Sequence, residues 1–152
     1  MISLANGDIF GIKEKNGLTK YLGIPYAHIP ARFERALDAA PWEGVKSCSK
    51  SFNYPQNTKI AARIPTLLPV INNPPFAYSS ENDLLLDIHI PKTEKSRKLA
   101  VMVYIHGGSY QVGGPVDYPG NDEFVTRGGV ILVVIQYRLG LAGFFSWNDD
   151  DG

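Results

Sequence analysis

Residues 101–110, Val-Met-Val-Tyr-Ile-His-Gly-Gly-Ser-Tyr, are the part of this chain whose residue types could do chemistry. Five apolar residues, three of them β-branched, run directly into His106-Gly107-Gly108-Ser109. A short apolar run of this kind is typical of a buried parallel strand. A glycine loop after such a strand can turn its backbone N–H groups toward a ligand. Those groups could stabilise negative charge that develops on an oxygen atom.

The nucleophile that would use such a loop is missing from the sequence. A serine on a sharp strand-to-helix turn is marked by Gly-x-Ser-x-Gly, and this motif does not occur in the 152 residues. Ser109 is no substitute, because Gly107-Gly108-Ser109-Tyr110-Gln111 lacks the final glycine. Gly108 and Gly113 have the spacing of a phosphate-binding loop. Such a loop is excluded, because Gly114-Pro115 stands where Lys-Ser/Thr is required.

Composition argues against several other classes of function. The 15 basic and 15 acidic residues cancel, so we expect no nucleic-acid partner. No apolar run is long enough to span a membrane. The three histidines, His28, His89 and His106, have no metal-ligand spacing, so we predict no metal site and no cofactor. His28 and His89 are expected to lie at the surface or to be half-buried.

The first 80 residues indicate hairpins followed by loops. Asn6-Gly7 and Asn16-Gly17 are hairpin turn dipeptides. The strand-like runs that flank them are residues 2–4, 8–13 and 18–22. Eight prolines between residues 25 and 75 exclude a long helix, so residues 25–80 are expected to form loops and short turns.

The second half of the chain predicts an α/β sheet. Residues 84–90 alternate, with Asp87 and His89 on one face and the following residues on the other: Leu84, Leu86, Ile88 and Ile90. The strand at 99–105 is expected to pair with this first strand as a hairpin, through the charged turn at residues 92–98. A short helix at 122–127, ended by Gly128-Gly129, then leads into an apolar strand at 130–136. Strand, helix and parallel strand make a βαβ unit.

Six blocks of sequence resemble the type-B carboxylesterase (cholinesterase-like) family of α/β-hydrolases, in the order that the family has them. They are Gly23-Ile24-Pro25-Tyr26-Ala27, Arg32-Phe33, Trp42-Glu43-Gly44-Val45, the stretch 80–88, Tyr104-Ile105-His106-Gly107-Gly108, and 136–140 with Gly143-Phe144. The resemblance implies the amino-terminal part of an α/β-hydrolase domain, incomplete at 152 residues. Its parts would be a β-hairpin region (1–24), Pro-rich loops (25–80), and central-sheet strands with the oxyanion loop (81–152).

The resemblance implies a serine hydrolase that acts on a small-molecule carboxylic ester. The backbone N–H groups of Gly108 and Ser109 would form part of the oxyanion hole, with Gly107 shaping the approach, while His106 supports the loop and is not the general base. Ser109 departs from the family's commonest Gly-Gly-Gly pattern, and it would be strained by about 1–2 kcal/mol if the loop required positive φ. The catalytic triad is absent, so residues 1–152 alone are expected to be inactive.

Two alternatives remain open beside the ester hydrolase: a non-catalytic, neuroligin-like adhesion protein, and an inactive truncated gene product. The absence of a signal segment and of glycosylation sequons, together with the single Cys48, favours a cytoplasmic location. Tyr54 and Asp83 stand where secreted family members have a pair of bridging cysteines. The family pattern further implies an Arg32–Glu81 ion pair. The oligomeric state is left open.

Overall fold

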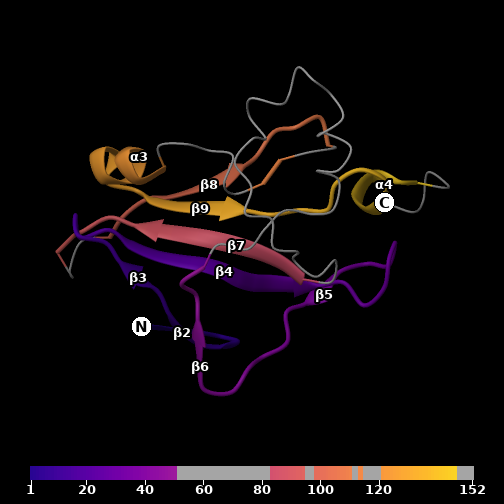
Figure 1. The fold of residues 1–152 in the computed structure, drawn as a ribbon, viewed down its shortest axis with the longest axis horizontal. Coiled ribbons are helices and arrows are strands. Elements are labelled where there is room, and N and C mark those ends of the chain that lie inside the picture. The colour runs from indigo at the N-terminus through magenta and orange to yellow at the C-terminus, as the bar shows by residue number, and fades with distance from the viewer. Residues whose placement is uncertain (51–82, 95–97, 111–112, 115–120, 147–152) are drawn as a thin grey trace.

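The structure, a computed structural model, describes residues 1–50, 83–94, 98–110, 113–114 and 121–146. Within these ranges the chain forms a three-stranded sheet and a six-stranded sheet. Figure 1 shows the small sheet beneath the large one, and two short helices near opposite ends of the large sheet. The expected combination of antiparallel hairpins with a parallel unit is confirmed.

The small sheet has three strands in the order β1-β2-β6: β1 (Ile2–Leu4), β2 (Gly7–Phe10) and β6 (Val45–Ser47). The first hairpin is confirmed, but its turn residues are Ala5 and Asn6, because Gly7 already pairs with Leu4. Gly7 has φ 141°, and a Cβ atom there would lie 2.6 Å from Trp42 Nε1. The close packing of Trp42 therefore requires glycine at this position.

The second hairpin joins β3 (Ile12–Lys13) to β4 (Thr19–His28) through the turn at Asn16-Gly17. Gly17 has φ 86°, which glycine adopts without strain. The Asn16 Oδ1 atom accepts a hydrogen bond from the Leu18 N–H at 3.0 Å. Both residues therefore take the turn positions that their types favour.

Strand β4 is longer than the sequence indicated. It runs through Pro25 to His28, although irregular chain was expected from residue 25. The pairing register shifts between Pro25 and Ala27, which marks a bulge, and a bulge accommodates a proline inside a strand. The expected loop region 25–80 also contains β5 (Leu37–Asp38), which pairs with β4, and β6. Residues 51–82 of that region lie outside the described residues.

The βαβ unit is confirmed. It consists of β8 (Val101–Ile105), α3 (Asn121–Gly128) and β9 (Ile131–Ile135). Strands β8 and β9 are parallel, with Ile105 opposite Ile135. Helix α3 ends as expected, because Gly129 has φ 61° and its N–H donates to the Val125 carbonyl at 3.0 Å.

The expected hairpin between residues 84–90 and 99–105 is wrong. Strand β7 (Asp83–Ile90) pairs with β4 and with β9, and β9 lies between β7 and β8 in the order β3-β4-β7-β9-β8. The physical reason is burial. Strand β9 is apolar at every position, and its Leu132 and Val134 are completely buried, so the central place in the sheet suits it better than an edge.

The two faces of the large sheet have different covers. On one face, Val125 of α3 packs with Leu18, Leu132 and Val134 in a fully buried cluster. On the other face, Tyr21 and Ile24 of β4 pack with Ile9 of the small sheet and with Cys48. The small sheet therefore covers one face of β4 and β7, and α3 covers the opposite face of the large sheet at β7 and β9.

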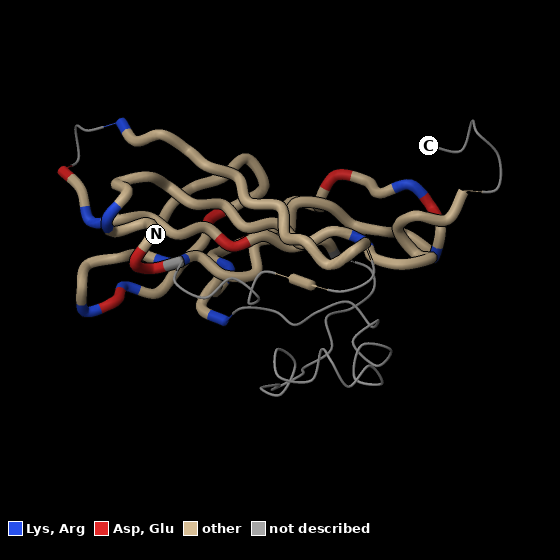
Figure 2. Tube along the Cα trace, turned by 90° about the horizontal axis from the view of Figure 1, so that it is seen from above, with Lys and Arg blue, Asp and Glu red and all other residues tan. Residues whose placement is uncertain are grey.

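Strand β8 is less well covered. The exposed fractions of Val101, Val103 and Ile105 are 61%, 55% and 63%, so the edge strand presents a row of apolar side chains to solvent. Figure 2 shows that the larger groups of charged residues lie toward the two ends of the sheets, with both signs present at each end. Among the described residues, no helix is long and apolar enough to cross a membrane.

Candidate oxyanion site

The glycine loop, residues 106–110, begins at the carboxyl end of the parallel pair β8–β9. Its backbone has positive φ at three consecutive residues: 130° at Gly108, 53° at Ser109 and 59° at Tyr110. Glycine adopts such angles freely, whereas a residue with a Cβ atom is strained by about 1–2 kcal/mol. Strain was expected at Ser109 if the loop required positive φ, and the structure has positive φ there. Tyr110 is in the same strained conformation.

The turn contains two adjacent candidate donors, the N–H groups of Gly108 and Ser109. The N–H groups of Gly108 and Ser109 make no hydrogen bond with any other described residue. Gly108 is half-exposed, and Ser109 and Gly107 are exposed. A Cβ atom on Gly107 would meet no atom within 4 Å, so the space beside the loop is open on that side.

The start of the loop is held by Tyr137, which follows β9. The Tyr137 hydroxyl donates a hydrogen bond to the His106 carbonyl at 2.6 Å. The two rings are stacked, with centroids 4.3 Å apart and planes within 16°. Burial raises the pKa of Tyr137, and the nearby Tyr110 and Tyr104 act in the same direction, so the phenol stays protonated as the donor.

The imidazole of His106 is only 3% exposed, and its Nδ1 atom lies 2.8 Å from the Gly107 carbonyl oxygen. Since a carbonyl can only accept, Nδ1 carries a proton in this contact. Nε2 is buried, and none of the described residues donates to it. His106 therefore braces the loop, as expected, and its geometry gives it no nucleophile to activate among the described residues.

Two further contacts hold the end of the loop. The Gly140 N–H donates to the Tyr110 carbonyl at 2.6 Å, and the rings of Tyr110 and Phe144 lie 4.6 Å apart. Phe144 is the last residue of α4 (Leu141–Phe144). Gly113 packs against the start of the loop so closely that a Cβ atom would lie 2.4 Å from both Gly107 O and His106 Nδ1.

The expected position of His89 is wrong. Its exposed fraction is 6%, because the face of β7 that carries it is covered by α3. His28, by contrast, is half-buried, as expected.

Cys48 is fully buried, and desolvation raises the pKa of its thiol, so it is a structural side chain. No group of three or more metal-ligating residues occurs within the described ranges.

The Arg32–Glu81 ion pair remains a prediction, because Glu81 lies outside the described residues, as does Tyr54. Arg138 donates to the Glu34 carbonyl at 2.8 Å, which ties the segment after β9 to the early loops.

The supporting roles of Tyr137, Gly113 and Gly140 were missed. One signal could have found Tyr137. In the parallel register Ile105 stands opposite Ile135, so the residues that follow both strands emerge side by side at the same sheet edge. An aromatic residue two places after β9 can therefore reach the first residue after β8.

Comparison with known proteins decides the family. The family model described as "Carboxylesterase family" matches residues 1–152. The chain belongs to the carboxylesterase family. It is 35% identical to gut esterase 1 of Caenorhabditis elegans over 95% of its own length, and 38% identical to carboxylesterase 1E of Mus musculus over 86%. A solved PNB esterase superposes with a TM-score of 0.75 at 29% identity, covering 94% of this chain.

The fold is accordingly the amino-terminal part of the α/β-hydrolase architecture of these esterases. The chain spans 24% of the length of gut esterase 1 and of carboxylesterase 1E, and 28% of the PNB esterase.

Proposed function

We propose that this chain supplies the oxyanion-binding loop of a carboxylesterase that hydrolyses small-molecule carboxylic esters. The N–H groups of Gly108 and Ser109 would stabilise the negative oxygen of the tetrahedral intermediate, and Gly107 would leave room for the ester to approach. Residues 1–152 would form the amino-terminal part of a larger carboxylesterase domain. A serine nucleophile, an acid and a general base would have to come from outside this sequence.

One observation supports this proposal most directly: the three successive positive φ angles at the carboxyl end of a parallel strand. They leave two neighbouring N–H groups without an acceptor among the described residues. Amides that are already oriented in this way need no reorganisation when charge develops on the substrate oxygen. Removing one such donor costs about 2.7–4 kcal/mol in comparable enzymes, which is 10²–10³ in kcat.

The test is a chimera of the solved PNB esterase, in which residues 101–114 of this chain replace the matching strand and loop. Two variants of the chimera are compared at position 109. One has alanine, and the other has the α-hydroxy acid with the same methyl side chain, so the two differ only in an N–H group that is replaced by an oxygen atom. We expect kcat for an aryl ester to fall about 10²–10³-fold. The same exchange at Gly107 is the matched control and should have a much smaller effect.

A chimera that folds but shows equal losses at positions 107 and 109 would contradict the assignment of the N–H groups. An inactive chimera with an intact nucleophile would contradict the hydrolase proposal itself. Residues 1–152 alone should show no ester turnover.

A further inference from the structure

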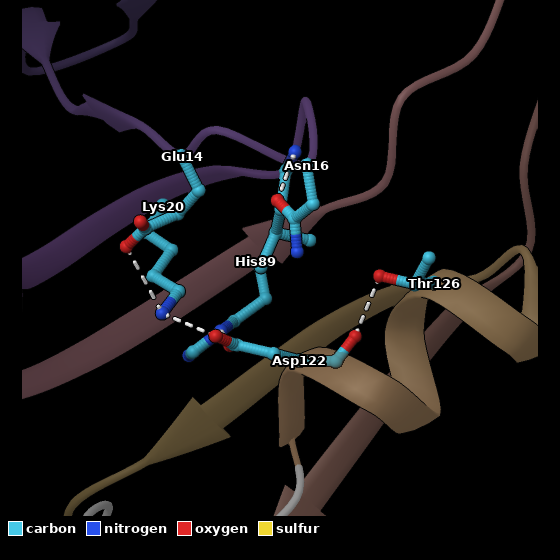
Figure 3. Close-up of polar contacts among 7 residues, drawn as sticks. Glu14, Asn16, Lys20, His89, Asp122 and Thr126 are labelled. Carbon is cyan, nitrogen blue, oxygen red and sulfur yellow. Dashed lines mark hydrogen bonds and ion pairs between the residues drawn. The ribbon is translucent and has the colours of Figure 1, made fainter.

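A buried histidine lies where α3 meets the large sheet, away from the glycine loop. His89 stands opposite Leu132 in the β7–β9 ladder, on the face that α3 covers. Its Nδ1 atom lies 3.4 Å from Asp122 Oδ1 in the first turn of α3, too far for a well-formed hydrogen bond. Figure 3 shows His89 and Lys20 pointing from neighbouring strands toward the same carboxylate.

Lys20 is the main cationic partner of Asp122. Its Nζ atom lies 2.6 Å from Asp122 Oδ2 and 3.3 Å from Glu14 Oε1. Burial disfavours the ammonium charge, but the hydrogen bond and the charge of Asp122, together with Glu14, outweigh it and raise the pKa of Lys20. The carboxylate beside His89 is therefore already paired, and a second cation at His89 would gain less from it.

Among the described residues, Asp87 is a further charged group close to His89, two residues earlier on β7. Asp87 is 5% exposed and accepts a hydrogen bond from the Gly23 N–H at 2.7 Å. Desolvation lowers the pKa of His89 below its ordinary value of 6.5; Asp87 and Asp122 oppose this shift only in part, and Lys20 adds to it. The packed arrangement thus holds a neutral imidazole against α3.

We propose that His89 is a proton-sensitive contact that loosens α3 from the sheet in mildly acidic solution. When α3 moves away, His89 meets water and binds a proton more readily than in the packed state. The part of the packing stability that depends on neutral His89 is therefore fully present above about pH 6.5. It is lost as the pH falls from there toward the lower pKa of packed His89. This inference does not depend on the proposed esterase function.

Hydrogen exchange of the 152-residue chain, followed by mass spectrometry between pH 7.5 and 5.5, tests the proposal. After correction for intrinsic exchange rates, the opening equilibrium of α3 should rise up to about tenfold for the one pH unit below 6.5. The β1–β2 hairpin is the internal control and should not follow this rise. An equal response in both segments, or none in α3, would overturn the proposal.

Three variants separate His89 from its neighbours. His89→Gln should remove the acid response, whereas the matched control His28→Gln should keep it. Asp122→Asn should extend the response to lower pH, because a protonated His89 then loses one of its carboxylate partners. If Asp122→Asn abolishes the response and His89→Gln does not, the carboxylate is the titrating group and the proposal is wrong.

An NMR titration of His89 in the unmodified chain provides a test that needs no variant. A pKa clearly below 6.5 supports the proposal, and a value at or above 6.5 contradicts it.

Discussion

Replacing Ser109 by glycine should raise the free energy of unfolding of this chain. Ser109 has φ 53°, which strains a residue with a Cβ atom by about 1–2 kcal/mol and leaves glycine unstrained. Glycine also gives the unfolded chain more freedom, which costs about 0.4–1 kcal/mol. The difference is a net stabilisation of roughly 0.5–1 kcal/mol. The Ser109 side chain is exposed, so its loss removes no packing in the core.

Equilibrium unfolding in urea, at the lowest protein concentration that gives a signal, measures this difference. Two control variants isolate its cause. Ser109→Ala keeps the Cβ atom and should bring no gain. Ser3→Gly makes the same exchange at an exposed position of β1, where φ is not positive, and should destabilise by about 0.5–1 kcal/mol. If Ser109→Gly is as destabilising as Ser3→Gly, residue 109 does not have positive φ, and the argument for the oriented N–H groups fails.

Two further variants, each with a control variant, test the packing around the loop and the exposed edge. Gly113→Ala should destabilise by about 2–4 kcal/mol, from positive φ (114°) and from a Cβ atom 2.4 Å from Gly107 O. Gly129 also has positive φ, but a Cβ atom there would meet no atom within 4 Å. Gly129→Ala should therefore lower the stability less, by about 1 kcal/mol in thermal unfolding. Val103→Lys should reduce aggregation in light scattering, because it places a charge in the apolar row of β8, whereas Val45→Lys, on an equally exposed position of the small sheet, should not.

Most elements of the fold could be predicted from local patterns, whereas strand neighbours could not. The hairpin turns, α3 and its glycine end, and the parallel β8–β9 pair all have signals within a few residues. The pairing of β7 with β9 rather than with β8 has no such signal, because it depends on which apolar strand gains most from the centre of the sheet. Alternation along β7 correctly placed Asp87 and His89 on the face opposite Leu86, Ile88 and Ile90. It could not show that α3 covers their face as well.

The same distinction applies to the site. The His-Gly-Gly-Ser motif and the strand before it located the loop, and the family resemblance assigned its N–H groups. The left-handed conformation of Ser109 and Tyr110 could not be read from residue types, since neither favours positive φ. It follows from contacts with residues about 30 positions later in the chain.

Those contacts come from one short segment, residues 136–140, which follows β9. Tyr137 holds the His106 carbonyl at the start of the loop, and Gly140 holds the Tyr110 carbonyl at its end. The two residues that flank Gly108 and Ser109 in the loop, His106 and Tyr110, are thus both fixed to the segment that follows β9. We therefore expect the register of β8 against β9, and not the serine side chain at position 109, to set the direction of these N–H groups. If this expectation holds, a loop that departs from Gly-Gly-Gly would keep the same backbone conformation at the cost of local strain.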